Sequence, residues 1–478
     1  MTDKKTPYFL ALLPILLLIS LLAYNVFLYG DNSLSGANQL ALLLAGASAA
    51  IIGVKYGTTW EVIISGITKS ISSTTPALII LLLIGSLAGT WLLSGIVPAM
   101  IYYGLQILSP KIFLLATCVI CAIVSLATGS SWSTIATIGI ALIGVGQALG
   151  FSMGITAGAI ISGAYFGDKM SPLSDTTNLA PTMAGTDLFT HIRYMMYTTI
   201  PSFIITLILF VIIGLNYQVH TLYDVNDLLI AIENTFTING WLFLVPALVI
   251  MLIVKKIAPI PALLAGTLAG GLFAVMFQPN IILSVSEEDV FSMKASYLAI
   301  INAMGNEITI FTENEMINEL LSTGGMYGML NTIWLIICAM IFGGTMEATH
   351  LLRRISEPIL QLANSTGSLV ATTAGTCIFF NITASDQYLS IVVPGRMFAN
   401  AYKEKGLASE NLSRTLEDSG TVTSVLIPWN TCGATQSAIL GVTTFTYLPY
   451  CFFNIISPFM TIAYAYLRIK IKHLNNRF

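Results

Sequence analysis

Long apolar stretches alternate with short polar segments along almost the whole chain. A helix needs about 20 apolar residues to cross roughly 30 Å of hydrocarbon. Stretches near this length cover residues 9–29, 37–54, 76–94, 111–127, 194–215, 240–254, 260–277, 328–346 and 442–467. Ten-residue segments of strictly alternating polarity, which are typical of a membrane β-barrel, do not occur. The pattern predicts an all-α polytopic membrane protein.

Charged residues are too scarce for a water-soluble protein. Of the 478 residues, 55% are hydrophobic and 9% are charged, whereas soluble domains carry roughly 25% charged residues. Two lysines precede the first apolar stretch and four basic residues follow the last. Because basic flanks favour the cytoplasmic side, we expect both termini there and an even number of crossings. The first stretch lacks a cleavage site and is expected to remain as a span.

Five parts are expected along the chain. They are an N-terminal span at 1–36, a first transporter repeat at 37–220, connecting and scaffold spans at 221–282, a polar loop at 283–327, and the remainder of a second transporter repeat at 328–478. The loop carries seven acidic residues and one lysine, which suits an external position.

Two segments of the chain match each other when the sequence is shifted by 255 positions. Residues 89–130 align with 344–385 without a gap and share ten identical residues. Two arginines, Arg353 and Arg354, follow the first span of the second copy, where the first copy has no basic residue. The charges therefore predict that the copies face opposite ways. Inverted repeats with a binding site at their interface are a transporter architecture.

Polar interruptions occur at matching places in the two copies. They cover residues 126–134 and 167–178 in the first copy, and 381–390 and 419–435 in the second. Their Gly, Pro, Ser and Thr residues stop helices and free backbone groups, which in lipid must be buried in protein or face a watery cavity. Such breaks in both halves indicate discontinuous helices around a transport site.

Aspartates at these breaks are the first candidates for ion binding. A carboxylate at mid-membrane costs about 2.5–3.5 kcal/mol on insertion scales, so its default role is functional. Asp175 and Asp386 are each surrounded by hydroxyl-bearing residues, and hard cations prefer such all-oxygen surroundings. We expect both to bind Na+ as the metal ligands of the site. Burial favours the protonated form of a carboxyl group, so one group can hold either a proton or a cation.

Other residues of the same breaks complete the expected ion and proton site. Asp168 beside Lys169 indicates either an internal ion pair or a functional group, and the Asn and Thr residues fit both helix caps and cation ligands. The full set is Asp175, Asp386, Asp168, Thr176, Thr177, Asn178, Ser130, Ser131, Ser385, Asn430 and Thr431. The polar segment 403–418 is expected to form a helix with a solvated or salt-bridged face, with gating or pH sensing as the alternative.

Enzymatic functions are disfavoured. Cys118 and Cys121 form a C-x-x-C inside an apolar run, which favours plain packing, and the four histidines are too dispersed for a metal cluster. An intramembrane aspartyl protease would need a G-x-G-D motif, but Tyr165 occupies the first glycine position of the matching segment. A channel is a further alternative. Neither a cofactor nor a nucleic-acid partner is expected.

Three segments carry a resemblance to a known family. They are GAYFGDKMSPLSDTTNLAP at 163–181, TASDQYLSIVVPGRMF at 383–398 and NLSRTLEDSGTVTSVLIPWNTCGA at 411–434. They resemble the NhaC-type Na+/H+ antiporter family of the ion-transporter superfamily, over about residues 38–465. The resemblance implies a secondary transporter of a bacterial inner membrane, with paired re-entrant hairpins, broken helices and an elevator-type movement. The stretch 283–327 departs from compact members.

The expected function is exchange of Na+ for H+ by alternating access. The family that the chain resembles also includes malate/lactate exchangers and amino-acid carriers, so an organic-acid or amino-acid antiporter coupled to Na+ or H+ is the alternative. Few arginines lie near the breaks, with Arg396 as the candidate partner for a carboxylate substrate, which favours a bare cation. The oligomeric state stays open, with a homodimer among the options.

Overall fold

Helices make up almost all of the chain. The computed structural model describes residues 6–29, 33, 35–217, 225–312, 318, 321–356, 358 and 364–474. Within these ranges, one short antiparallel pair is the only sheet, formed by β1 (Ile308–Thr309) and β2 (Ser322–Thr323). Eight of the described helices are long and apolar enough to cross a membrane, or up to ten if two bent pairs each count as one span. The prediction of an all-α polytopic membrane protein is confirmed.

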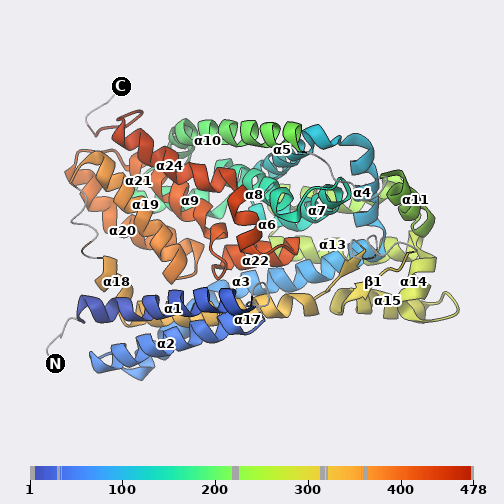
Figure 1. Ribbon diagram of the computed structural model, residues 1–478, viewed down its shortest axis with the longest axis horizontal. Helices are drawn as coiled ribbons and strands as arrows, with labels where there is room; N and C mark the ends of the chain where they lie inside the picture. The colour runs from blue at the N-terminus through green and yellow to red at the C-terminus, as the bar shows by residue number, and fades with distance from the viewer. Residues whose placement is uncertain are drawn as a thin grey trace.

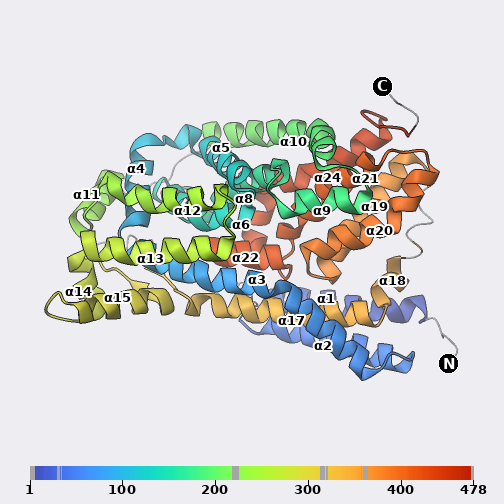
Figure 2. The same cartoon turned by 180° about the vertical axis from the view of Figure 1, so that it is seen from behind.

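Long helices packed around α3 form one layer, along the lower side of Figure 1 and again in the reverse view of Figure 2. Its members are α1 (Tyr8–Tyr29), α2 (Ala37–Lys55), α3 (Trp60–Leu93), α13 (Pro259–Phe277), α15 (Met293–Gly305) and α17 (Leu330–Ala348). The helix α12 (Leu244–Val254) packs on α13 above this layer in Figure 2. Small residues allow close approach: a Cβ added at Gly89 would lie 1.7 Å from the carbonyl oxygen of Ala303. In lipid, burying apolar side chains between helices gives little hydrophobic free energy because the lipid tails are equally apolar. Helices therefore associate through close packing at small residues.

The second layer contains the interrupted helices. It consists of α5 (Pro110–Thr128), α8 (Met153–Met170), α9 (Asp175–Ala184), α10 (Leu188–Asn216), α19 (Thr366–Thr383), α20 (Gln387–Glu404), α21 (Ser409–Leu416), α22 (Thr431–Leu440) and α24 (Phe452–Tyr466). The contact between α5 and α8 is especially close, since a Cβ at Gly163 would lie 2.1 Å from the carbonyl oxygen of Cys118. Cys118 and Cys121 are buried in the packing between these helices, as expected.

Shorter elements make up the rest of the described helical structure. They are α4 (Ile96–Ile107), α6 (Ser131–Thr134), the π-helix η2 (Ile135–Gly139), α7 (Ile140–Ala148), α11 (Val225–Thr235), the 3-10 helix η3 (Gly240–Phe243), α14 (Pro279–Ser286), the 3-10 helix η4 (Tyr327–Met329), α18 (Leu351–Ser356), the π-helix η6 (Glu417–Thr421), the 3-10 helix η7 (Ser424–Leu426), α23 (Thr444–Tyr447) and the 3-10 helix η8 (Leu448–Tyr450). The described part of the stretch 283–327 contains α15 and both strands. The hydroxyl of Ser86 on α3 donates to the carbonyl of Met304 at 3.1 Å, which ties α15 to the first layer.

Helix ends recur at the spacing of the sequence repeat. α3 ends at Leu93 and α17 at Ala348, while α5 ends at Thr128 and α19 at Thr383, so each pair is 255 residues apart. Both α5 and α19 are followed by a break of two or three residues before the next helix begins. The repeat in the sequence is therefore also a repeat of helix boundaries. The opposite orientation of the two copies and the elevator-type movement stay predictions.

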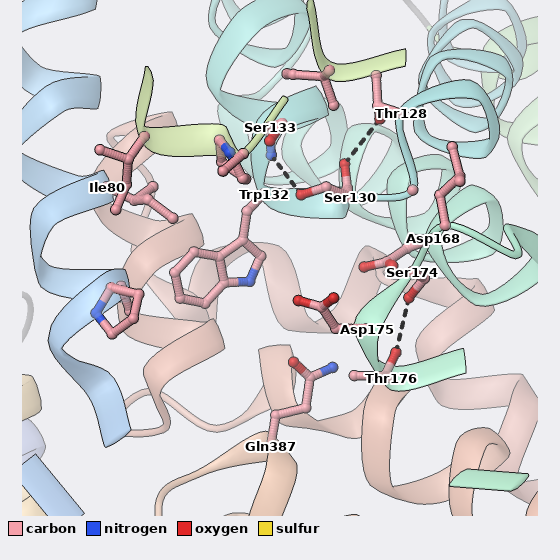
Figure 3. A pocket seen from close by; sticks show the side chains of 18 of the residues that line it. Ile80, Thr128, Ser130, Trp132, Ser133, Asp168, Ser174, Asp175, Thr176 and Gln387 are labelled. Carbon is pink, nitrogen blue, oxygen red and sulfur yellow. Dashed lines mark hydrogen bonds between the residues drawn. The ribbon is translucent and has the colours of Figure 1, made fainter. Parts of the chain in front are cut away.

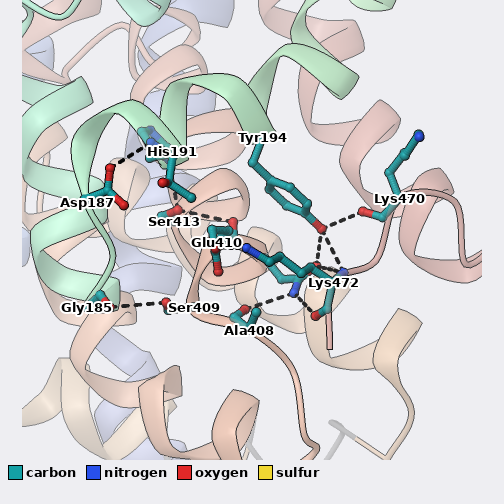
Figure 4. A network of polar contacts seen from close by, with 12 residues as sticks. Gly185, Asp187, His191, Tyr194, Ala408, Ser409, Glu410, Ser413, Lys470 and Lys472 are labelled. Carbon is teal, nitrogen blue, oxygen red and sulfur yellow. Dashed lines mark hydrogen bonds and ion pairs between the residues drawn. The ribbon is translucent and has the colours of Figure 1, made fainter. Parts of the chain in front are cut away.

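A segment after α24 returns to the start of α21 and ties it to α10 (Figure 4). The hydroxyl oxygen of Tyr194 lies 2.5 Å from both Asn411 Oδ1 and the carbonyl oxygen of Lys470, and it accepts a bond from the backbone N–H of Lys472. The ammonium of Lys472 pairs with Glu410 Oε1 at 2.5 Å. We call residues 468–474 the return segment.

Burial of α21 corrects one expectation from the sequence. The segment 403–418 was expected to have a solvated or salt-bridged face, but every residue of α21 from Glu410 to Leu416 is buried. The guanidinium of Arg414 lies 4.6 Å from the centre of the Tyr194 ring, and its Nη1 donates to the carbonyl of Lys470 at 3.3 Å. A solvated face is present at residues 403–405, which are exposed, but is wrong for residues 410–418, which α10 and the return segment help to cover. The expected ion pairs are present at Glu410 and Asp418.

Candidate functional site

Each of the four breaks ends at a helix whose first turn is capped by a polar side chain. A side-chain oxygen at this position accepts from one of the backbone N–H groups that have no partner inside the helix, and its loss costs about 1 kcal/mol. The four bonds run from Ser133 N to Ser130 Oγ (3.2 Å), from Thr177 N to Ser174 Oγ (3.5 Å), from Leu389 N to Asp386 Oδ1 (2.9 Å) and from Cys432 N to Asn430 Oδ1 (3.0 Å). The local sequence therefore restarts a helix after every break.

Within each copy the two breaks touch. Gly129 ends α5 with a positive φ of 71°, and a Cβ there would lie 2.6 Å from the Cβ of Leu173 in the next break. In the second copy the positive φ falls one residue later than the repeat spacing gives, at Ser385 (58°), whose carbonyl accepts from the N–H of Thr431 at 3.0 Å. A left-handed backbone suits glycine and is uncommon for serine. The left-handed backbone at Gly129 and Ser385 lets each copy of the repeat turn sharply enough to bring its two breaks together.

A cavity of about 800 Å³ lies where all four breaks meet the first layer (Figure 3). Its polar wall is formed by Thr128, Ser130, Ser133, Asp168, Ser174, Asp175, Thr176, Asp386, Gln387, Tyr388 and Thr431. Residues of α3 from Ser73 to Ile80 and the turn between α12 and α13, including Lys256, form the opposite side. Breaks that are some 300 residues apart in sequence thus share one chamber.

Three carboxyl groups line this cavity in different surroundings. Asp168 is 8% exposed, and its Oδ2 accepts from both the N–H (3.1 Å) and the hydroxyl (2.6 Å) of Ser131. Asp386 is 5% exposed and caps α20. Asp175 is exposed at the first residue of α9, and Figure 3 shows its carboxylate pointing into the cavity. Two carboxyl groups are therefore held in the wall, and the third extends from it.

Six of the eleven residues expected from the sequence line the cavity, and the other five bond residues of the breaks without lining it. The lining residues are Asp175, Asp386, Asp168, Thr176, Ser130 and Thr431. Ser131 bonds Asp168, Ser385 bonds Thr431, and Thr177 donates to the carbonyls of Asp168 (3.2 Å) and Lys169 (3.0 Å). Asn178 is exposed and donates to the carbonyl of Ser174 (2.7 Å). Asn430 is buried and donates to the carbonyl of Asn381 (3.1 Å).

A charged cluster behind the cavity wall was not expected as part of the site. Lys169 forms a fully buried ion pair with Asp418, so the ion pair foreseen for Lys169 exists but with a partner from the other repeat. Ser457 and Thr198 also bond this pair, at 3.0 Å to Lys169 and 2.8 Å to Asp418. Next to it, Glu417 Oε1 accepts from the hydroxyl of Thr176, a cavity-lining residue, at 3.0 Å.

One sequence signal could have located this cluster. Asp168 and Lys169 lie at the start of the second break, and Glu417 and Asp418 directly precede the fourth. Two adjacent charged residues beside a break in each repeat indicate a buried, paired role, since isolated charges are expensive in a membrane.

Chemically, the cavity favours cations. Its described lining contains three carboxyl groups and one ammonium, that of Lys256, together with several hydroxyls. Carboxylate, hydroxyl and carbonyl oxygens are the ligands that hard cations prefer. The interrupted helices and the polar cavity where they meet define a polytopic α-helical membrane protein with an oxygen-rich binding cavity.

Comparison with known proteins identifies the family. Residues 163–469 match the Na+/H+ antiporter family. The chain is 40% identical over 423 residues to the Na+/H+ antiporter NhaC of Alkalihalophilus pseudofirmus, covering 88% of both chains. It is 37% identical over 470 residues to the malate-2H+/Na+-lactate antiporter of Bacillus subtilis, covering 98% of this chain and 96% of that one. It is 33% identical over 474 residues to the arginine/ornithine antiporter ArcD of Halobacterium salinarum, covering 98% and 94%. The chain belongs to the Na+/H+ antiporter family.

Proposed function

We propose that this protein exchanges Na+ for H+ across a bacterial inner membrane by alternating access. The observation that carries the proposal is the meeting of four helix breaks at one cavity, whose described lining contains three aspartates and one lysine. Na+ would bind between Asp175 and Asp386, with the hydroxyls of Ser130, Thr176 and Thr431 completing its oxygen shell. Family membership and the relatives named as Na+/H+ antiporters support this assignment.

Exchange follows from the cost of moving an uncompensated carboxylate through lipid. With Na+ or a proton bound, the site carries less charge and can change its exposure from one side to the other. When it is empty, its carboxylates oppose the same movement, because a charge at mid-membrane is expensive. We propose an elevator-type movement in which the second layer slides against α3 and α17. In this scheme both termini lie in the cytoplasm.

A second candidate is exchange of an organic acid or an amino acid. The observation in its favour is the cavity volume, about 800 Å³, which falls in the range of pockets that hold small molecules. Lys256 would supply the one cationic partner for a carboxylate in the described lining. The names of the malate/lactate and arginine/ornithine relatives support this candidate. The excess of carboxyl groups over ammonium groups favours the first.

Transport by purified protein in liposomes separates the two candidates. A pH-sensitive dye inside the vesicles should report proton movement when Na+ or Li+ is added. The dye signal should not change when K+, malate or lactate is added. Asp175→Asn and Asp386→Asn should each abolish the signal. Asp187→Asn is the matched control, because Asp187 caps α10, is exposed and lies outside the cavity lining. Proton movement driven by malate or lactate and not by Na+ would refute the proposal.

A further inference from the structure

A second cavity, of about 500 Å³, lies between the two layers. One wall is formed by the end of α17, the turn at His350 and α18, and the other wall by α19 and α20. Both views show α18 between α20 and the long helices of the first layer (Figure 1 and Figure 2). A ligand in this cavity therefore contacts both layers at once.

Basic residues distinguish this cavity from the first one. Its described lining contains two arginines, Arg353 and Arg396, together with His350 and one acid, Glu347. The described lining of the first cavity has three carboxyl groups and one ammonium. Both arginines are exposed, so they can reach a ligand that arrives from outside the protein. Arg396, the candidate partner for a carboxylate substrate, thus lines the second cavity and is not part of the described lining of the first.

Apolar side chains lie beside the arginines in the same cavity. Phe380 is 1% exposed, and Val393 and Met397 are half-buried. Val393 and Arg396 are three residues apart on α20, so they lie on the same face of that helix. A guanidinium binds phosphate through two parallel N–H···O bonds, and apolar side chains are the surroundings that hydrocarbon prefers. The cavity thus matches a ligand that has an anionic oxygen group at one end and a hydrocarbon body.

We propose that this cavity binds the headgroup of an anionic phospholipid. Arg353 and Arg396 hold the phosphate, and the apolar residues of α19 and α20 contact the start of an acyl chain. Basic pockets between transmembrane helices are places where anionic headgroups bind. The bound lipid connects α18 of the first layer to α20 of the second. It also contacts the turn that carries Asp386, because Leu389 lines this cavity and donates its N–H to Asp386 Oδ1.

Lipid binding to the purified protein in detergent, followed by native mass spectrometry, tests this assignment without a measurement of transport. Phosphatidylglycerol should bind about tenfold more tightly than phosphatidylcholine, whose headgroup has no net charge. Arg353→Gln and Arg396→Gln should each weaken phosphatidylglycerol binding about fivefold, which is the expected contribution of one basic residue. The matched control is Arg193→Gln, an exposed arginine of α10 outside the cavity lining, which should leave binding unchanged.

Glu347→Gln gives a test of opposite sign, which a misfolded variant cannot imitate. It removes the one acid of the described lining and should strengthen phosphatidylglycerol binding about fivefold, by the same contribution of one charge. The assignment is overturned if the two lipids bind equally, or if all three cavity variants bind phosphatidylglycerol like wild type.

Soluble anions distinguish a lipid site from a site for a free anion. Glycerol 3-phosphate, inorganic phosphate and malate lack acyl chains, so each should displace phosphatidylglycerol only at a concentration about a hundredfold higher than that of the lipid. Displacement by any of them at an equal concentration would assign the cavity to a soluble anion and overturn the lipid proposal.

Discussion

Removing Lys169 should destabilise the protein more than most single substitutions. Its ammonium and the Asp418 carboxylate are both fully buried and paired with each other. In Lys169→Met, the Asp418 carboxylate keeps the hydroxyls of Thr198 and Ser457 as its hydrogen-bond partners among the described residues. Breaking a buried ion pair by removing one partner costs about 3–5 kcal/mol, because the other charge is left uncompensated.

The expected effect can be expressed as a melting temperature. Unfolding entropy is about 2.1 cal/mol/K per residue, so for a chain of 478 residues a change of about 1 kcal/mol shifts Tm by about 1 °C. Lys169→Met should therefore melt about 3–5 °C below wild type in detergent. The double variant Lys169→Met/Asp418→Asn should recover at least about 2 °C of this loss, because no unpaired charge remains.

The exposed pair of Lys294 and Glu288 is the control for this cycle. Lys294 has a side chain 72% exposed, and surface pairs contribute little to stability. Lys294→Met should therefore leave Tm within about 1 °C of wild type. The reasoning is refuted if the double variant melts at or below Lys169→Met, because the two charges would then act independently of each other.

Three further predictions concern the helix caps, the tight packing and the return segment. Asp386→Asn and Asp386→Ala should both lose exchange, but only the alanine variant loses the cap of α20 and should lower Tm further, by about 1 °C for a loss of about 1 kcal/mol. Gly433→Ala would place a Cβ 2.0 Å from the carbonyl oxygen of Ile427 and should destabilise by about 1–3 kcal/mol, whereas Gly375→Ala, with open space around it, should melt like wild type. Tyr194→Phe removes the hydroxyl bonded to Asn411 and to the return segment, so trypsin should cut that segment faster, and an unchanged cutting rate would contradict its anchoring role.

The helical spans and the breaks could be predicted because their physical causes are local. Apolar runs of membrane length must become helices in lipid, where backbone groups have no water to bond. Hydroxyl-bearing and glycine residues at matching places in two copies were enough to locate the breaks at Gly129, Ser174, Asp386 and Asn430. The meeting of these breaks at one cavity was also foreseeable, since it follows from the repeat.

Burial of polar segments could not be predicted because it depends on partners that are distant in sequence. The segment 403–418 has the composition of a solvated helix, yet Arg414 and Glu417 are buried by residues of α8, α9, α10 and the return segment. Conversely, Asp175 was expected to be withdrawn from water like Asp386, but it extends into the cavity. The residues adjacent in sequence therefore do not predict whether a polar side chain is buried or extends into the cavity.

The cap on α20 has a consequence for how cargo could travel. One oxygen of the Asp386 carboxylate is fastened to the N–H of Leu389, three residues further along the same helix. A side chain tethered in this way cannot swing like a lever arm from one face of the membrane to the other. An ion bound to Asp386 would move only together with α20. The distance that the ion travels would then be set by the rigid-body displacement of α20 and not by rotamer changes of Asp386.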